Sequence, residues 1–533
     1  MAQSQPLPGF DVREASIESV QNAIFSGVTT CRSVVSAFIT RIEAFNPEIN
    51  AIITLNPNAL TIADEMDLAL GNGNASGPLF GIPVLVKDNY DVLPMKTTGG
   101  CLALQDSIPT TDAPTINALR RAGAIILGKT NLHELALEGL SVSSYGGQTI
   151  NPYDHTRTPG GSSGGTGAAI AASFAVFGTG TYTVNSLRSP ASANNLFSFR
   201  PTRGLISRAG VIPISYTQDA VGAIGRSLVD IAKALTVMTS VGYDSNDNTT
   251  SLRPSSVEGI DYSASMLGGT LSGVRLGLVE GFFSRTTTNE TTPVNDAMDH
   301  VASILTAAGA TVVKIDDPIY NATAIQANHD VQQYEYRQEL SAYLKRPSLQ
   351  GEHPESMPDL YKNSSGKFLV IPAQYGYVNN AIVSSTDNAT YASRSATDLI
   401  VSISSTFKQH SLDAFIYPQQ KNLVVKIGSP SQSGRNGILA AVTGSPVVTV
   451  PIGFSPASED APIGVPIGME IFGLPWTESR LLQIARLLDE RMRVRKMPVY
   501  CNGTVEVKSY ESVPVIRPDS GNVDTKAYPL GAL

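Results

Sequence analysis

Three residues that could together catalyse acyl transfer occur in unusual sequence surroundings. Ser162 lies in the turn Gly160-Gly-Ser-Ser-Gly-Gly, and Ser186 ends a second turn that is rich in Thr and Gly. Lys87 ends the apolar run 81–87, which is typical of a buried strand. Burial favours the neutral amine of a lysine, and a neutral amine can accept a proton. Two serines on glycine turns plus a buried lysine therefore indicate a serine hydrolase that needs no histidine.

The region 160–191 does not stand alone. Further blocks occur in a fixed order: 81–89, Thr97-Thr-Gly-Gly, Gly128-Lys-Thr-Asn, 151–159, 200–204 and 443–453. Together they resemble the amidase signature family, whose members cleave amide bonds with a Ser–cis-Ser–Lys triad. The resemblance spans most of residues 14–240 and 410–497. It implies one amidase domain over 1–533, with a helical segment at 14–50, a signature core at 80–240, a variable substrate entrance at 241–410, a C-terminal core part at 411–497 and a tail at 498–533.

The resemblance also assigns roles to individual residues. Ser186 aligns with the nucleophile, Ser162 with the serine that relays a proton, and Lys87 with the base that later acts as an acid. The peptide bond before Ser162 is expected to be cis. The backbone amides of the turn 183–186 are expected to bind the developing oxyanion, which adds Thr183, Val184 and Asn185 to the candidate site.

The turn before the nucleophile departs from the family pattern. Members carry Asp-X-Gly-Gly-Ser, whereas this chain reads Tyr182-Thr-Val-Asn-Ser. Asn185 tolerates left-handed backbone and can replace a glycine. Tyr182 is the larger change, because an acidic residue there could pair with Arg188 and brace the turn. The sequence does not decide whether this change silences, slows or redirects the chemistry.

Other residues of these blocks are assigned by position in the family. The expected pocket-lining residues are Met95, Thr98, Glu138, Tyr145, Ser163 and Tyr182. Asp219 and Arg226 are expected to form a structural salt bridge. Lys129, the rival base, is interpreted as structural. The six histidines show no metal-ligand spacing, and His133-Glu134 lacks the second histidine of a zinc protease motif. No metal and no organic cofactor are expected.

Composition narrows the range of partners. A net charge of −8 with 16% charged residues argues against nucleic acid as a partner. No run of about 18 apolar residues predicts a membrane span, and the first twelve residues lack a signal-peptide pattern. The three cysteines are too few for a disulfide framework. Localisation stays open, since a leader could have been removed. A small amide is the expected substrate, and a homodimer is expected by analogy alone.

Helices and apolar strands alternate along the chain, which predicts an α/β fold with a mixed, twisted central sheet covered by helices on both faces. Expected helices include 16–27, 30–45 ended by Asn46-Pro, 115–123, 294–307, 327–343 and 481–495. Expected strands are 51–55, 83–86, 124–127, 211–214, 274–279 and 447–452. The helix expected at 166–176 has no polar face, which places it in the centre of the protein.

Four functions are compatible with these residues. The main expectation is a hydrolase of non-peptide amide bonds. The acyl-enzyme could instead be passed to another amine or alcohol, or Tyr182 could mark an inactive relative. The chain could also be the amide-cleaving subunit of a tRNA-dependent amidotransferase, although nothing in the sequence resembles a docking surface.

Overall fold

The structure is a computed structural model that describes residues 10–364 and 366–533. The first nine residues, on which most of the signal-peptide expectation depends, lie outside this description. An 11-stranded sheet runs through the described part in the order β1-β4-β2-β7-β9-β8-β14-β15-β13-β10-β11. Its strands are β1 Ile52–Leu55, β2 Ile82–Lys87, β4 Ala124–Thr130, β7 Phe177–Tyr182, β8 Phe197–Arg200, β9 Ala220–Gly225, β10 Arg275–Val279, β11 Thr311–Ile315, β13 Ala414–Pro418, β14 Val447–Phe454 and β15 Pro466–Phe472.

The sheet is mixed, as predicted. β2 runs parallel to β4 and β7, and β10 runs parallel to β11 and β13. The remaining neighbours in the sheet pair antiparallel. Two short ribbons lie apart from it, formed by β3 Ile108–Pro109 with β12 Leu349–Gln350 and by β5 Val142–Ser143 with β6 Gly147–Gln148.

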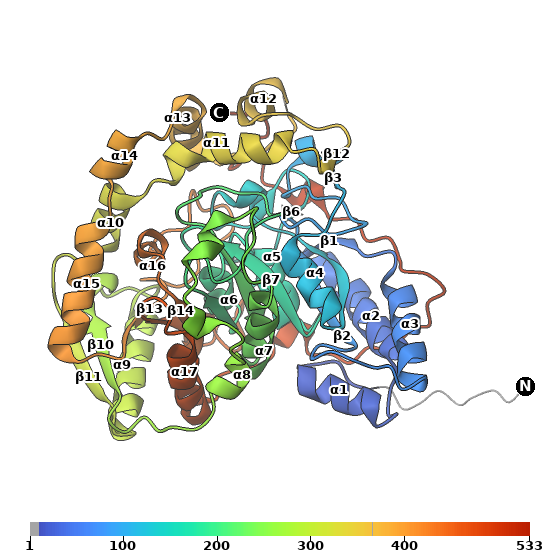
Figure 1. The fold of residues 1–533 in the computed structure, drawn as a ribbon, viewed down its shortest axis with the longest axis horizontal. Coiled ribbons are helices and arrows are strands. Elements are labelled where there is room, and N and C mark those ends of the chain that lie inside the picture. Colours follow the sequence, from blue (N-terminus) through green and yellow to red (C-terminus); the bar gives the residue numbers. More distant parts are fainter. Residues whose placement is uncertain (1–9, 365) are drawn as a thin grey trace, which may run out of the picture.

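Helices flank the sheet, which confirms the predicted α/β architecture (Figure 1). They are α1 Ile17–Phe25, α2 Cys31–Ile49, α3 Ala59–Gly71, α4 Pro114–Arg121, α5 Gly164–Ala171, α6 Arg188–Ala193, α7 Leu228–Thr239, α8 Tyr262–Ser265, α9 Thr292–Ala307, α10 Ala322–His329, α11 Gln332–Lys345, α12 Met357–Asn363, α13 Tyr375–Val383, α14 Asn388–Ser393, α15 Thr397–His410, α16 Ile438–Thr443 and α17 Glu478–Met492. In Figure 1, α11, α12 and α13 gather at the top of the view. No helix in the described ranges has the length and apolar character that a membrane span requires.

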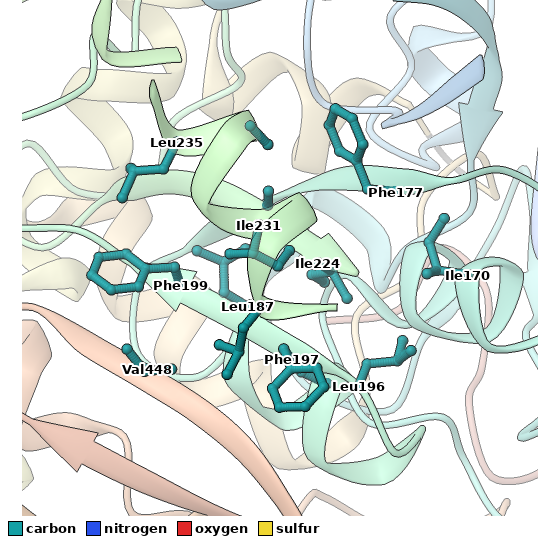
Figure 2. Packing of buried hydrophobic residues seen from close by; sticks show 14 of the residues in the cluster. Ile170, Phe177, Leu187, Leu196, Phe197, Phe199, Ile224, Ile231, Leu235 and Val448 are labelled. Carbon is teal, nitrogen blue, oxygen red and sulfur yellow. The ribbon is translucent and has the colours of Figure 1, made fainter. Parts of the chain in front are cut away.

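The core around the candidate site is built from the sheet and its two central helices. Figure 2 shows Ile170 of α5 and Ile231 of α7 among the apolar side chains of β7, β8 and β9. Every residue of α5 is buried, which confirms the predicted central position of this segment. The helix is shorter than expected, however. It ends at Ala171, and Ser173 follows with a left-handed φ of 59°, so that the chain turns directly into β7.

Three other elements differ from the sequence predictions. Helix α2 continues through Pro47 to Ile49, because a proline in the last turn removes only one hydrogen bond. The segment 211–214 forms no strand: Val211 makes an isolated bridge to Tyr90, and Pro213 has no N–H to extend a ladder. The predicted helix 327–343 is divided into α10 and α11, because the N–H of Val331 donates to the side chain of Gln218.

Candidate functional site

Lys87 is completely buried at the end of β2. Its Nζ lies 2.8 Å from Ser162 Oγ and 2.7 Å from Thr181 Oγ1, which also accepts from Asn89 Nδ2 at 3.1 Å. Burial lowers the pKa of Lys87 well below its ordinary value, and the distant charge of Asp219 opposes this only partly. No carboxylate in the described residues forms an ion pair with Lys87. The amine is therefore held among hydroxyl groups in surroundings that favour its neutral form.

Ser162 is buried between two segments of the core. The peptide bond from Gly161 to Ser162 is cis. The carbonyl oxygen of Ser162 accepts from the N–H of His133 at 3.0 Å, and the N–H of Ser163 donates to the carbonyl oxygen of Ser186 at 3.3 Å. The two serine turns are thus hydrogen-bonded directly to each other, with Lys87 on one side and the turn 183–186 on the other.

Ser186 lies in the wall of a cavity of about 110 Å³. Its turn connects β7 to α6, and the carbonyl oxygen of Asn185 accepts from the N–H groups of Arg188 and Ser189 at 2.9 Å each. No described residue accepts a hydrogen bond from the N–H of Val184, Asn185 or Ser186. These donors belong to residues that line the cavity, as an oxyanion-binding turn requires.

Arg188, which is completely buried, stabilises the turn 183–186. Its guanidinium donates to Glu470 of β15, to the hydroxyl of Tyr182, to Val184 O at 3.0 Å and to Gly437 O at 2.6 Å. Glu470 therefore supplies the carboxylate that the sequence pattern lacks at position 182. The absence of an acid at position 182 therefore does not leave Arg188 without a charged partner.

Tyr182 has a structural position of its own. Its ring lies between two guanidinium groups, 4.6 Å from that of Arg188 and 5.0 Å from that of Arg200, and its hydroxyl donates to Gly437 O at 2.5 Å. An aromatic face stabilises nearby cations, and burial raises the pKa of Tyr182 to about 12, so the side chain stays neutral. The residue is fully buried and does not line the cavity.

Two adjacent cavities meet at Ala136 and Thr183. The cavity of Ser186 is polar and is lined by Ala136, Leu137, Glu138, Gly139, Gly161, Thr183, Val184, Asn185, Ser186, Gln326, Asp330, Gln332, Gln374, Tyr377 and Arg435. The other cavity measures about 250 Å³, and its wall includes Thr181, Asp219, Glu339 and Tyr343. Thr181 thus lies between Lys87 and this larger space.

Of the six predicted lining residues, only Glu138 lines either cavity. The other five, Met95, Thr98, Tyr145, Ser163 and Tyr182, do not. The hydroxyl of Thr98 donates to Asp88 instead, and the hydroxyl of Ser163 donates to Thr181 O at 3.4 Å. These two side chains connect segments of the core and do not form the cavity wall.

The remaining predictions concern charged and histidine side chains. Lys129 pairs with Asp88 at 3.0 Å, in agreement with a structural role. Among the described residues Asp219 and Arg226 do not pair with each other, and Arg226 Nε lies 3.9 Å from Glu14 Oε1 instead. Asp219 accepts from the hydroxyl of Thr183 at 2.6 Å, while Arg226 donates to carbonyl oxygens of the core. Burial lowers the pKa of His133 to about 4, so its ring is neutral. Among the described residues, no three side chains are grouped to hold a metal ion.

Sequence reasoning missed several side chains of the site. Thr181 was recoverable in principle, because it alternates with Thr179 along a strand that ends at the predicted turn. Glu470, Arg435, Asp330 and Tyr377 had no such signal. They come from segments far along the chain that meet the site only in the folded protein.

Comparison with known proteins gives one consistent result. The family model described as Amidase matches residues 33–482. The chain is 30% identical over 484 residues to a glutamyl-tRNA(Gln) amidotransferase subunit from Acinetobacter baumannii, and the match covers 89% of this chain and 95% of that protein.

Two solved structures agree. A native peptide amidase from Stenotrophomonas maltophilia is 33% identical, with a TM-score of 0.80 and coverage of 93% of this chain and 100% of the other. An amidase family protein from Bacillus anthracis is 25% identical, with a TM-score of 0.76 and coverage of 92% and 95%. The chain belongs to the amidase signature family.

Proposed function

We propose that this amidase hydrolyses a carboxamide through an acyl-enzyme on Ser186, with Ser162 and Lys87 completing the catalytic triad. The observation that carries the proposal is the contact of 2.8 Å between Lys87 Nζ and Ser162 Oγ, in a fully buried environment where no described carboxylate forms an ion pair with the amine. The other buried lysine of this region, Lys129, is held in an ion pair with Asp88. Lys87 is the amine that can act as a base.

In the first step, neutral Lys87 accepts the proton of the Ser162 hydroxyl as Ser162 accepts that of Ser186. Ser186 Oγ then forms a bond to the carbonyl carbon, and the carbonyl π electrons move to oxygen. The hydrogen bond from Ser163 N–H to Ser186 O supports this relay, since it holds the two turns together. The resulting oxyanion accepts hydrogen bonds from the backbone amides of the turn 183–186.

In the second step, the C–N bond breaks and the leaving nitrogen takes a proton from Ser162, which is reprotonated by Lys87. Water then attacks the ester carbon of the acyl-enzyme and passes a proton through Ser162 to Lys87. The bond between the acyl carbon and Ser186 Oγ breaks, Ser186 Oγ takes a proton back along the same route, and the carboxylic acid leaves. After one turnover Ser186, Ser162 and Lys87 have regained their starting protonation states, and one water has been consumed. The residues therefore suffice for hydrolysis in which water is the only co-reactant.

We also propose that the scissile bond is a non-peptide amide. Ser186 is only 7% exposed, and its cavity of about 110 Å³ holds roughly four waters. A polypeptide bound in the middle of its chain would have to extend from both sides of the scissile bond. A terminal carboxamide needs room on the acyl side alone.

Intact-mass analysis after treatment with a fluorophosphonate probe tests the nucleophile. We expect one adduct on the wild-type protein and none on Ser186→Ala. Ser189→Ala is a control for the reagent, because Ser189 is a buried serine on the adjoining helix α6. An adduct that persists in Ser186→Ala, or a wild-type protein that never reacts, would contradict the assignment.

Acyl transfer is a second candidate, and the larger cavity next to Thr183 is the observation that favours it. An amine bound there could reach the acyl-enzyme in place of water. Adding hydroxylamine to an active reaction measures the partition between acid and hydroxamate. A ratio of hydroxamate to acid that saturates with hydroxylamine concentration supports a bound acceptor. A ratio that rises linearly supports hydrolysis without an acceptor site.

A further inference from the structure

Two residues that line the cavity beside Ser186 each carry a buried side-chain polar atom that no described residue satisfies. The hydroxyl of Tyr377 on α13 is buried and has no hydrogen-bond partner among the described residues, and neither has the side-chain nitrogen of Asn185. Both residues line the cavity of Ser186. A buried donor without a partner costs about 1–3 kcal/mol, so an acceptor oxygen of a ligand that reached these donors would offset that cost.

A third donor in this cavity is held in place by a buried carboxylate. Arg435 pairs with Glu138 at 2.8 Å, and its side chain is 25% exposed while that of Glu138 is inaccessible. Glu138 in turn accepts from the N–H of Gly139 at 2.9 Å and from Gln374 Nε2 at 2.8 Å. The guanidinium is therefore positioned by one of its edges, and its other N–H groups remain available to a ligand.

The charges of the cavity determine which acceptor is suitable. Glu138 balances Arg435, and Asp330 adds a further carboxyl group to the same wall. The wall has no excess of positive charge to offset a ligand carboxylate. A neutral carbonyl oxygen takes hydrogen bonds from the same donors without this electrostatic cost.

We propose that Arg435 and the hydroxyl of Tyr377 bind a second, neutral carbonyl oxygen in the acyl part of the substrate. The preferred substrates are then uncharged carboxamides that carry a ketone or amide carbonyl a few bonds from the scissile group. This inference rests on the proposed hydrolysis at Ser186 and adds the determinant of its acyl specificity. Asn185, next to the nucleophile, belongs to the oxyanion turn.

Four carboxamides with the same leaving group test the preference: pentanamide, 4-oxopentanamide, N-acetylglycinamide and succinamate. The first two differ by one carbonyl oxygen, the third places an amide carbonyl at the same position, and the fourth places a carboxylate there. Ammonia release gives kcat/KM for each. We expect the two neutral carbonyl substrates to exceed pentanamide by about tenfold or more, as one or two good hydrogen bonds provide, and succinamate to fall below both.

Tyr377→Phe and Arg435→Gln test the residues. Removal of an unpartnered hydroxyl should leave folding unchanged, so a loss of about tenfold for 4-oxopentanamide with no change for pentanamide would assign the contact to Tyr377. Arg435→Gln should also reduce the ratio of kcat/KM for 4-oxopentanamide to kcat/KM for pentanamide. Arg121→Gln, which removes an exposed arginine at the end of α4, is the matched control and should preserve it.

The rate of fluorophosphonate labelling of Ser186 distinguishes failure of the proposed hydrolysis from failure of the carbonyl site. If Ser186 is not labelled, the proposed function fails. If Ser186 is labelled but pentanamide is cleaved as well as 4-oxopentanamide, or neither carbonyl substrate is cleaved, the carbonyl site alone is refuted. Preference for succinamate would show that the cavity selects an anion, and would also overturn the proposal.

Discussion

The guanidinium of Arg188 and the carboxylate of Glu470 form a fully buried ion pair although they are 282 positions apart in the chain. Arg188 begins the helix that follows the turn 183–186, and Glu470 lies on β15. Through the same guanidinium the pair holds Val184 O and Gly437 O. The shape of the turn 183–186 thus depends on a carboxylate from another region of the sheet.

Glu470→Gln should therefore loosen the turn and destabilise the protein. Loss of one partner of a buried ion pair typically costs about 3–5 kcal/mol. Urea unfolding gives the free energy of unfolding, and fluorophosphonate labelling of Ser186 gives the effect on the site. Tyr182→Phe keeps the ring between the two arginines and should cost about 1 kcal/mol for the lost hydroxyl contact. Equal effects of the two changes would argue against a special role for Glu470.

Moving the carboxylate from position 470 to position 182 tests whether Arg188 can be paired from either position. Tyr182→Asp alone should be destabilising, because it adds a second buried acid near Arg188 and removes the ring. Combined with Glu470→Gln, it should be less harmful than the sum of the single changes, since one acid again faces one arginine. A double-mutant cycle on the free energy of unfolding measures this coupling, and strict additivity would contradict it.

Lys87→Met should reduce the rate of Ser186 labelling by about a thousandfold or more, because the proposed base is removed. The protein should stay folded with equal or greater stability, since a methionine fills similar space without the desolvation cost of an amine. Circular dichroism and thermal unfolding check the fold. Lys129→Met, which leaves Asp88 unpaired, is the contrasting variant: it should be destabilising. A Lys87→Met protein that is labelled at the wild-type rate would exclude the lysine from catalysis.

The lowered pKa of Lys87 also predicts a pH dependence. Labelling should rise with pH as Lys87 loses its proton, with a midpoint below the ordinary value of 10.5. For stability, the unfolded chain binds a proton on Lys87 between the two pKa values and the folded chain does not. Stability therefore increases with pH across that window. Lys87→Met should remove this contribution. A labelling rate independent of pH up to 10.5 would contradict the assignment.

Gly165→Ala tests how closely α5 must approach the backbone of Asn131. A Cβ at Gly165 would lie 2.1 Å from the carbonyl oxygen of Asn131, and backbone at this position cannot move easily. We expect a loss of about 1–3 kcal/mol or more in the free energy of unfolding. Gly376→Ala on α13 has open space around it and should be neutral or stabilising by up to about 1 kcal/mol. Similar stability of the two variants would refute the steric argument.

The sequence alone determined features that are local. Lys87 ends a continuous apolar run, which by itself predicts a buried strand and a buried amine. The glycine turn at 160–165 and the turn before Ser186 could be recognised in the same way, as could the alternation of helices and strands that predicts the mixed sheet. Each of these depends on neighbours a few positions away, and such information is present in the order of the residues.

Only the tertiary structure decided which distant residues complete these local features. Glu470 reaches Arg188 because β14 and β15 lie between β8 and β13 in the sheet. Tyr377 reaches the cavity of Ser186 from the region of weak family resemblance and Arg435 from the C-terminal core part. No periodic pattern predicts the direction of either side chain. Buried charges and donors must find partners wherever the folded chain places them. The identity of those partners is therefore a property of the packing and not of the local sequence.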